Sequence, residues 1–412
     1  MRTKIIFLFF KVSVFVLIVL STISPKAFKI LTGFEGVYPN PHLFLAIIYI
    51  PLFVVLGFAK INNYTINSMF FGLLLSLIYW LSAFLAYVSY YSDINSILQS
   101  IRYTLTYLFL IPLFFSIKSK YIDVIVKLFI LNALIYIPIF LYGLGVFFNL
   151  IPSINDNLKS LIYEDILSMS WTALGFIPKW RVVFEETQVM ATFYLISAIL
   201  AYKVNMKVYF LIFSIFSVYL FSKSALIGLF LYLSYIFIYK RLKDSVSKLF
   251  VIYTAIVISI LLLYKFYSIE KQLFTNIYEA GVENAASFGE RIFHIYQTFL
   301  FMSENIYTFF IGLGPRVYGS LVSQLYPWRF NIDSNAISFF TVFQDIGIVG
   351  FASTIMYIYY VLWRKIKDTD IRIGFIAVLV AYMLQVSWGH SIILIGLTLL
   401  VRISWRKYEN IH

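Results

Sequence analysis

The chain has 412 residues, of which 61% are hydrophobic, 20% aromatic and only 12% charged. Its mean hydropathy of +0.88 excludes an ordinary soluble domain and predicts an integral membrane protein. The formal net charge of +13 does not indicate a nucleic-acid partner, because membrane proteins normally carry Lys and Arg in their cytoplasmic loops. Without cysteine, disulfides and thiolate metal sites are excluded, and the four histidines lack a classical zinc-site spacing, so no metal is expected.

Apolar runs long enough to cross a bilayer as helices recur along the whole chain. They predict an all-α, polytopic fold with about twelve transmembrane helices, in a single membrane domain that covers residues 1–412. The run after Met1–Lys4 resembles a signal peptide but lacks a small-residue cleavage site, so we predict a retained first helix. In chain order, the expected spans are residues 5–23, 42–59, 68–88, 103–117, 122–149, 187–202, 208–221, 224–239, 249–267, 337–362, 373–387 and 391–405.

The distribution of basic residues orients these spans. If the N-terminus is cytoplasmic, short inner connections hold 17 of the 32 Lys and Arg residues, and the outer connections hold about 12 over a much greater length. This pattern predicts that both termini are cytoplasmic.

Two outer connections are much longer than the others, residues 150–186 and 268–336. Both keep aromatic and aliphatic residues among their charges, unlike disordered linkers, so we expect short helices at the membrane surface. The spans are then the scaffold, and these two loops hold the candidate functional site. We see no internal repeat.

Charged residues cluster where the two loops approach the spans. In PKWRVVFEETQVM (178–190), Arg181, Glu185 and Glu186 form either an interfacial anchor with an i,i+4 pair or a functional group. In SFGERIFHIYQTF (287–299), Arg291 and His294 are one turn apart, and the alternative is the polar face of a surface helix.

Five more charged positions have both a functional and a purely structural interpretation. Arg316 in GLGPRVYG belongs to a turn or to an anion-binding nest, and Lys223 snorkels or binds a ligand. Arg329 and Asp333 precede a span, where Asp333 is also a good helix cap. Asp345, about eight residues into the same span, is either functional or part of a structural pair.

We predict that arginines from separate outer segments, Arg181, Arg291, Arg316 and Arg329, converge to hold a departing diphosphate. Such a site needs no metal, because the guanidinium groups compensate the negative charge. A neighbouring carboxylate or His294 is placed to orient or deprotonate a sugar hydroxyl.

The chain resembles the O-antigen polymerase (Wzy) family, within the larger group that includes O-antigen ligases. The resemblance covers the predicted architecture and the order of RVVFEETQVMATFYL, FSKSALIGL, GERIFHIYQTFLFMSENIYTFFIGLG and DSNAISFFTVFQDIGIVG. It implies a multi-pass protein of the bacterial inner membrane. The activity it implies is metal-independent, inverting glycosyl transfer at the periplasmic face without a cofactor, between undecaprenyl-diphosphate-linked oligosaccharides.

The same resemblance assigns residues and partners. Arg181 and Arg291 match the diphosphate-binding arginines of the periplasmic loops, and the general base stays open among Glu186, Asp333 and His294. Lys223 stands where an arginine is often seen, and DSN replaces a ligase-type histidine before the asparagine, which favours a polymerase. Expected partners are the lipid-linked oligosaccharide, membrane lipids and a chain-length regulator protein. An O-antigen ligase acting on lipid A core and a lipid-linked glycan flippase or transporter are the alternatives.

Overall fold

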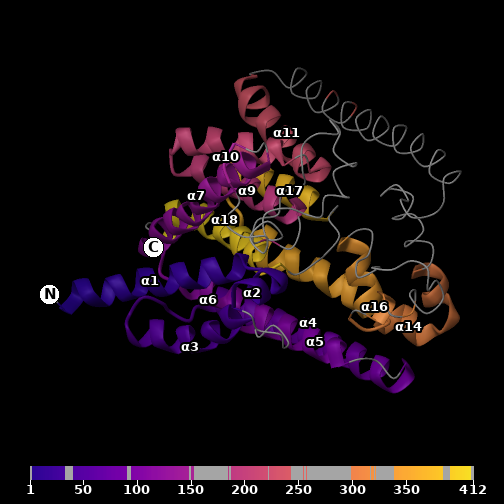
Figure 1. Ribbon diagram of the computed structural model, residues 1–412. Helices are drawn as coiled ribbons and strands as arrows, with labels where there is room; N and C mark the ends of the chain where they lie inside the picture. Colours follow the sequence, from indigo (N-terminus) through magenta and orange to yellow (C-terminus); the bar gives the residue numbers. More distant parts are fainter. Residues whose placement is uncertain are drawn as a thin grey trace, which may run out of the picture.

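The computed structural model describes residues 2–32, 40–90, 94–147, 150–152, 184, 187–220, 222–242, 254, 257, 298–315, 317–319, 321, 338–383 and 390–409. Within them the fold is all-α, and the extended contact is limited to an isolated bridge between Ala59 and Ile117. Figure 1 shows the helices gathered into an elongated bundle.

The elements follow the chain in a regular back-and-forth path. They are α1 (Arg2–Thr22), α2 (Pro25–Thr32), α3 (Pro41–Val55), α4 (Asn63–Tyr90), α5 (Ile94–Leu105), η1 (Thr106–Leu110), α6 (Ile111–Ser116), η2 (Ser119–Tyr121), α7 (Ile122–Phe147), α9 (Thr187–Lys203), α10 (Lys207–Tyr219), α11 (Lys223–Phe237), η4 (Tyr239–Arg241), α14 (Ile306–Ile311), α16 (Ser338–Tyr357), η6 (Ile358–Leu362), η7 (Trp363–Lys365), α17 (Thr369–Met383) and α18 (Ser391–Glu409).

Helices occupy eleven of the twelve predicted spans, and the ninth, 249–267, lies almost wholly outside the described residues. Six described helices are long and apolar enough to cross a membrane: Thr3–Thr22, Asn63–Val88, Ser96–Ser116, Ser119–Val146, Ser224–Arg241 and Phe340–Lys365. The chain is therefore an all-α membrane protein. Shorter apolar helices stand at three other predicted spans: Pro41–Val55, Lys207–Tyr219 and Ser391–Trp405.

Helices α9 and α18 form the centre of the bundle. Nearly every residue of α9, and residues 391–405 of α18, are buried. Helices that are apolar all round need such a covered position. The peripheral helices α1, α4 and α10 instead expose large apolar side chains on one face, such as Leu8, Phe70 and Leu211, as lipid-facing helices do.

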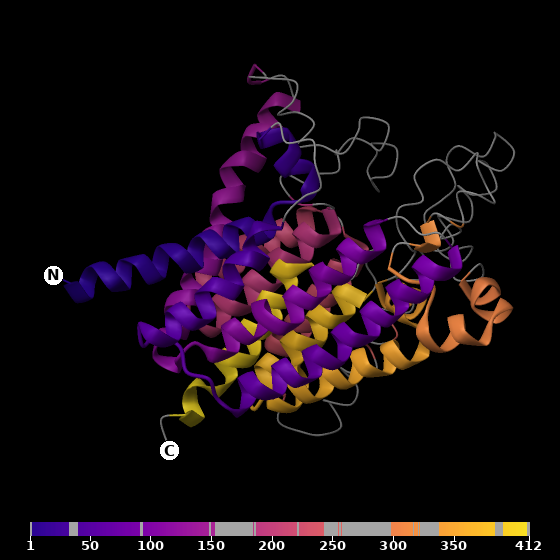
Figure 2. The same ribbon diagram turned by 90° about the horizontal axis from the view of Figure 1, so that it is seen from below.

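Connections predicted to be cytoplasmic meet at one end of the bundle, which we call the basic end because Lys60, Lys118, Lys203, Lys240 and Lys365 lie there. The Lys60 N–H donates to the Ser116 carbonyl at 2.7 Å, and the Arg402 guanidinium donates to the Ile117 carbonyl. The start of α1 and the end of α18 lie at this end (Figures 1 and 2).

Helix α16 is broken rather than continuous, unlike the predicted span 337–362. Ile346 has φ −131° and Gly347 has φ 63°, so the carbonyls of Gln344 and Asp345 lose their helical partners. The N–H groups of Leu313 and Gly314 donate to these two carbonyls at 2.7 and 3.1 Å, and the Ser82 hydroxyl of α4 donates to Asp345 as well. A turn from the predicted second loop thus completes the broken helix.

Candidate functional site

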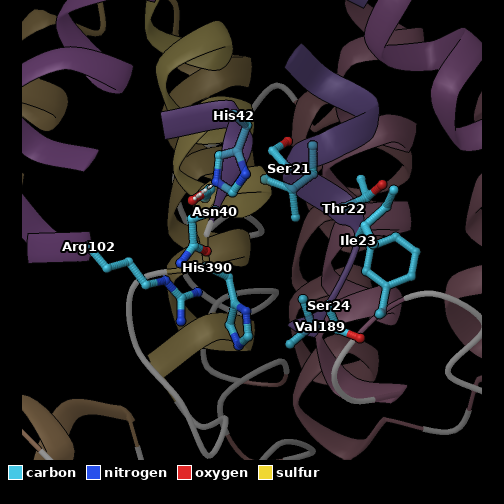
Figure 3. A pocket seen from close by; sticks show the side chains of 12 residues that line it. Ser21, Thr22, Ile23, Ser24, Asn40, His42, Arg102, Val189 and His390 are labelled. Atoms are coloured by element: carbon cyan, nitrogen blue, oxygen red, sulfur yellow. Dashed lines mark hydrogen bonds between the residues drawn. The ribbon is translucent and has the colours of Figure 1, made fainter. Parts of the chain in front are cut away.

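A small, open pocket lies where the end of α1 and the starts of α3, α9 and α18 meet Arg102 of α5. Figure 3 shows Arg102 extending from α5 toward Asn40 and His390, with His42 on the same side. Ser21 to Ser24 and Val189 face them across the pocket. The complete lining is Ser21, Thr22, Ile23, Ser24, Asn40, His42, Arg102, Phe184, Val189, His390, Ser391 and Ile392.

Three helices begin at this pocket. Asn40 and His42 flank the first residue of α3, Val189 lies in the first turn of α9, and His390 precedes α18. A helix N-terminus carries partial positive charge, because its first N–H groups have no intrahelical partner. Together with Arg102, these termini make the pocket electropositive, and none of its described lining residues is acidic.

The polar side chains of the pocket keep unused hydrogen-bonding capacity. Arg102 Nε and His42 Nδ1 are buried and have no hydrogen-bond partner among the described residues. The other ring nitrogen of His42, Nε2, is 2.9 Å from Ser391 Oγ. Arg102 is also close enough to act electrostatically on His42. Arg102 Nε is therefore a donor available to an acceptor bound in the pocket.

Packing beneath the pocket holds its wall in place. Thr22 and Tyr136 share a hydrogen bond, and the Tyr136 ring meets Phe184 with centroids 5.3 Å apart. Ser24 accepts the Ala27 N–H at 3.1 Å and so caps α2. The His390 N–H donates to the Tyr382 hydroxyl at 2.9 Å. These contacts fix the segments that carry the lining residues.

Comparison with protein families and with curated proteins gives no template for this pocket. No protein-family model matches this chain, and no curated protein matches it. What the pocket favours follows from its own groups: one guanidinium, two imidazoles, hydroxyls and three helix N-termini suit an anion that accepts several hydrogen bonds.

The side chains predicted as the diphosphate site and as the general base fall outside the described ones, and their roles stay predictions. They are Arg181, Arg291, Arg316, Arg329, Glu186, Asp333 and His294. The backbone of Lys223 is described as the first residue of α11, where Ser222 caps the helix, but its side chain is not. In the chain, Glu186 lies between two lining residues, Phe184 and Val189.

Sequence reasoning missed Arg102, His42 and His390 as site residues. Each stands at a predicted span boundary, and the three are separated by 60 and 288 positions in the chain. A local motif does not connect them. The available signal was their position: polar residues at the predicted outer ends of three spans.

Two other predicted positions acquire structural roles. The N–H groups of Leu313 and Gly314, in the turn proposed as an anion nest, are used by carbonyls of α16, which leaves the plain turn as the interpretation. Asp345 lies beside this junction, 4% exposed, and its carbonyl is the acceptor there.

Proposed function

We propose that this chain polymerises undecaprenyl-diphosphate-linked oligosaccharide repeat units into O-antigen or a related surface polysaccharide. It acts at the periplasmic face of the bacterial inner membrane, with the basic end in the cytoplasm and the pocket on the periplasmic side. The orientation rests on the excess of Lys and Arg in the short connections of the basic end.

The observation that carries the proposal is the electropositive pocket. A carrier-lipid diphosphate is an anion at the membrane boundary, and it becomes more negative as the glycosidic bond breaks. Arg102 and the N-termini of α3, α9 and α18 supply fixed positive charge where that negative charge develops. The buried Arg102 Nε without a partner is one donor available for a phosphate oxygen.

The reaction balances without a co-reactant. A hydroxyl of the acceptor repeat unit attacks the anomeric carbon of the donor, whose bond to the diphosphate oxygen breaks with inversion. The bond electrons leave with undecaprenyl diphosphate, and the hydroxyl proton passes to a base. The predicted base candidates Glu186, Asp333 and His294 keep that role.

Complementation of a deletion strain tests the proposal. With Arg102→Gln we expect glycan capped at a single repeat unit in place of long chains, because the departing diphosphate loses the guanidinium that would bind it. Arg241→Gln, an exposed arginine at the basic end, is the matched control and should restore long glycan. Arg181→Ala and Arg291→Ala extend the test to the predicted loop arginines.

The outcome also separates the alternatives. If cells that contain normal levels of the Arg102→Gln protein make long glycan, the pocket takes no part in the reaction. Long glycan that accumulates on the carrier lipid of the deletion strain would indicate a ligase. Repeat units confined to the cytoplasmic leaflet would indicate a flippase.

A further inference from the structure

The segment 298–311, which we call the aromatic hairpin, is apolar on two opposite faces. Residues 298–304 are helical, Asn305 interrupts the helix, and α14 follows. The Asn305 side chain accepts the Tyr307 N–H at 2.9 Å, and Thr308 returns a hydrogen bond to the Asn305 carbonyl at 2.6 Å. These bonds fix the turn between the two short helices.

One face of the aromatic hairpin packs on the bundle. Phe301 and Met302 are buried in a small core with Ala86 of α4 and Phe343 of α16. Ring contacts join Phe309 to Phe343, with centroids 5.9 Å apart. Figure 1 accordingly shows α14 beside the first half of α16, far from the basic end.

The other face is large and apolar, and no described residue covers it. Ile306 is 67% exposed, Tyr307 68% and Phe310 46%, and Leu300 of the preceding helix is 40% exposed. Water is an unfavourable environment for an outer face made of large apolar side chains. Exposed polar side chains are confined to its tip, Ser303, Glu304 and Asn305.

The depth of the hairpin follows from the turn after it. Gly314 lies against Ser82 and Ala86, and Ser82 is eight residues before the end of α4, about 12 Å along the axis. Helix α4 has 28 residues and measures about 42 Å, more than the roughly 30 Å hydrocarbon layer. The turn therefore lies just inside the hydrocarbon boundary if α4 crosses the membrane.

The outer end of α4, which the hairpin core contacts at Ala86, also exposes large apolar side chains. Phe84, Tyr87 and Val88, on the same end of α4 as Ala86, are 62%, 55% and 61% exposed. We propose that the aromatic hairpin is embedded in the lipid at the outer boundary of the bilayer, with Ile306, Tyr307 and Phe310 in contact with acyl chains. This part of the predicted second periplasmic loop is then a membrane-contact element. The proposal does not depend on the reaction catalysed.

The natural absence of cysteine allows a direct test in the full chain. Single spin labels at Ile306→Cys, Tyr307→Cys and Phe310→Cys, in protein reconstituted into bilayers, report collisions with oxygen, which concentrates in lipid, and with a water-soluble nickel complex. Phe84→Cys is the matched lipid control, and Arg241→Cys the aqueous control. We expect an oxygen-to-nickel ratio like that of Phe84 and several-fold above that of Arg241.

Two results would overturn the proposal. Nickel collisions as frequent as at Arg241 would place the face in water. Low collisions with both reagents would mean that protein, such as a second copy of this chain, covers it. Because all three sites are exposed, the two remaining labels still decide if one variant fails to fold.

Discussion

The two ends of the bundle use charge in opposite ways. At the basic end, Lys203 binds Asp368 at 2.9 Å and Asp370 at 3.2 Å, and Lys240 binds Asp370 at 2.9 Å. At the pocket end, buried nitrogens of Arg102 and His42 have no partner among the described residues. Carboxylates neutralise Lys203 and Lys240 at the basic end, whereas the described lining of the pocket offers Arg102 no acidic residue.

The two ends also differ in what links their helices. The basic end joins α9 and η4 to α17 through ion pairs of side chains. Away from it, α4 and α16 are joined through the 312–314 turn, mainly by backbone amides and carbonyls. The comparison predicts that different substitutions will destabilise the packing of helices at the two ends.

The largest effect is expected at the turn. Gly312 has φ 96°, and a Cβ added there would lie 2.4 Å from the Asp345 carbonyl oxygen. Gly312→Ala should lower the free energy of unfolding by about 3 kcal/mol, through backbone strain and displacement of the turn. Gly57→Ala is the control: φ is 77°, but the nearest atom is 4.0 Å away, so only strain of about 1 kcal/mol applies. Equal losses in denaturant titrations of the two would contradict the assignment.

At the basic end, the double variant Asp368→Asn, Asp370→Asn should cost about 2–3 kcal/mol. It leaves Lys203, whose side chain is only 17% exposed, without a carboxylate. The same titration measures this loss, and Lys240→Gln is a milder comparison because its side chain is 48% exposed. A double variant as stable as the wild type would show that these pairs do not hold the helices together.

Arg102→Gln should leave folding stability nearly unchanged while weakening ligand binding. Loss of a charge-assisted hydrogen bond is worth about 1.5–3 kcal/mol, or roughly 10- to 100-fold in Kd. Titration of undecaprenyl diphosphate into nanodiscs measures the change, with Arg241→Gln as control. If the Arg102→Gln variant has a lower free energy of unfolding but binds undecaprenyl diphosphate as tightly as the wild type, Arg102 stabilises the fold and does not bind the ligand.

The smallest effect is a pH dependence confined to the basic end. Burial acts to raise the pKa of Asp370, but Lys240 and Lys203 outweigh it and hold the pKa below its ordinary value. The resulting stability is present above the unfolded-state pKa of about 4 and is lost as pH falls through the lower folded-state value. The stability difference between wild type and Asp370→Asn should therefore shrink below about pH 4. A difference that stays constant on acidification would exclude this linkage.

The sequence predicted most helix positions, because lipid leaves the backbone few alternatives. It also grouped the connections that carry Lys60, Lys118, Lys203 and Lys240, which the structure brings to one end. The break in α16 was not predicted, since Ile346 and Gly347 stand in an apolar run whose hydropathy is that of an unbroken helix.

The pocket could not be predicted from local pattern. His42, Arg102 and His390 meet only because α3, α5 and α18 pack with their ends together. Hydropathy locates each span but does not say which spans are neighbours. The loop residues predicted for the site, Arg181 and Arg291 among them, lie outside the described residues and stay predictions.

The repair of α16 has a consequence for biosynthesis. Ser82, Leu313 and Gly314, which supply the hydrogen atoms for the open carbonyls of Gln344 and Asp345, all precede those carbonyls in the chain. A ribosome therefore delivers the donors to the membrane before the acceptors emerge. The open carbonyls of α16 can therefore accept their hydrogen bonds as soon as this helix enters the membrane.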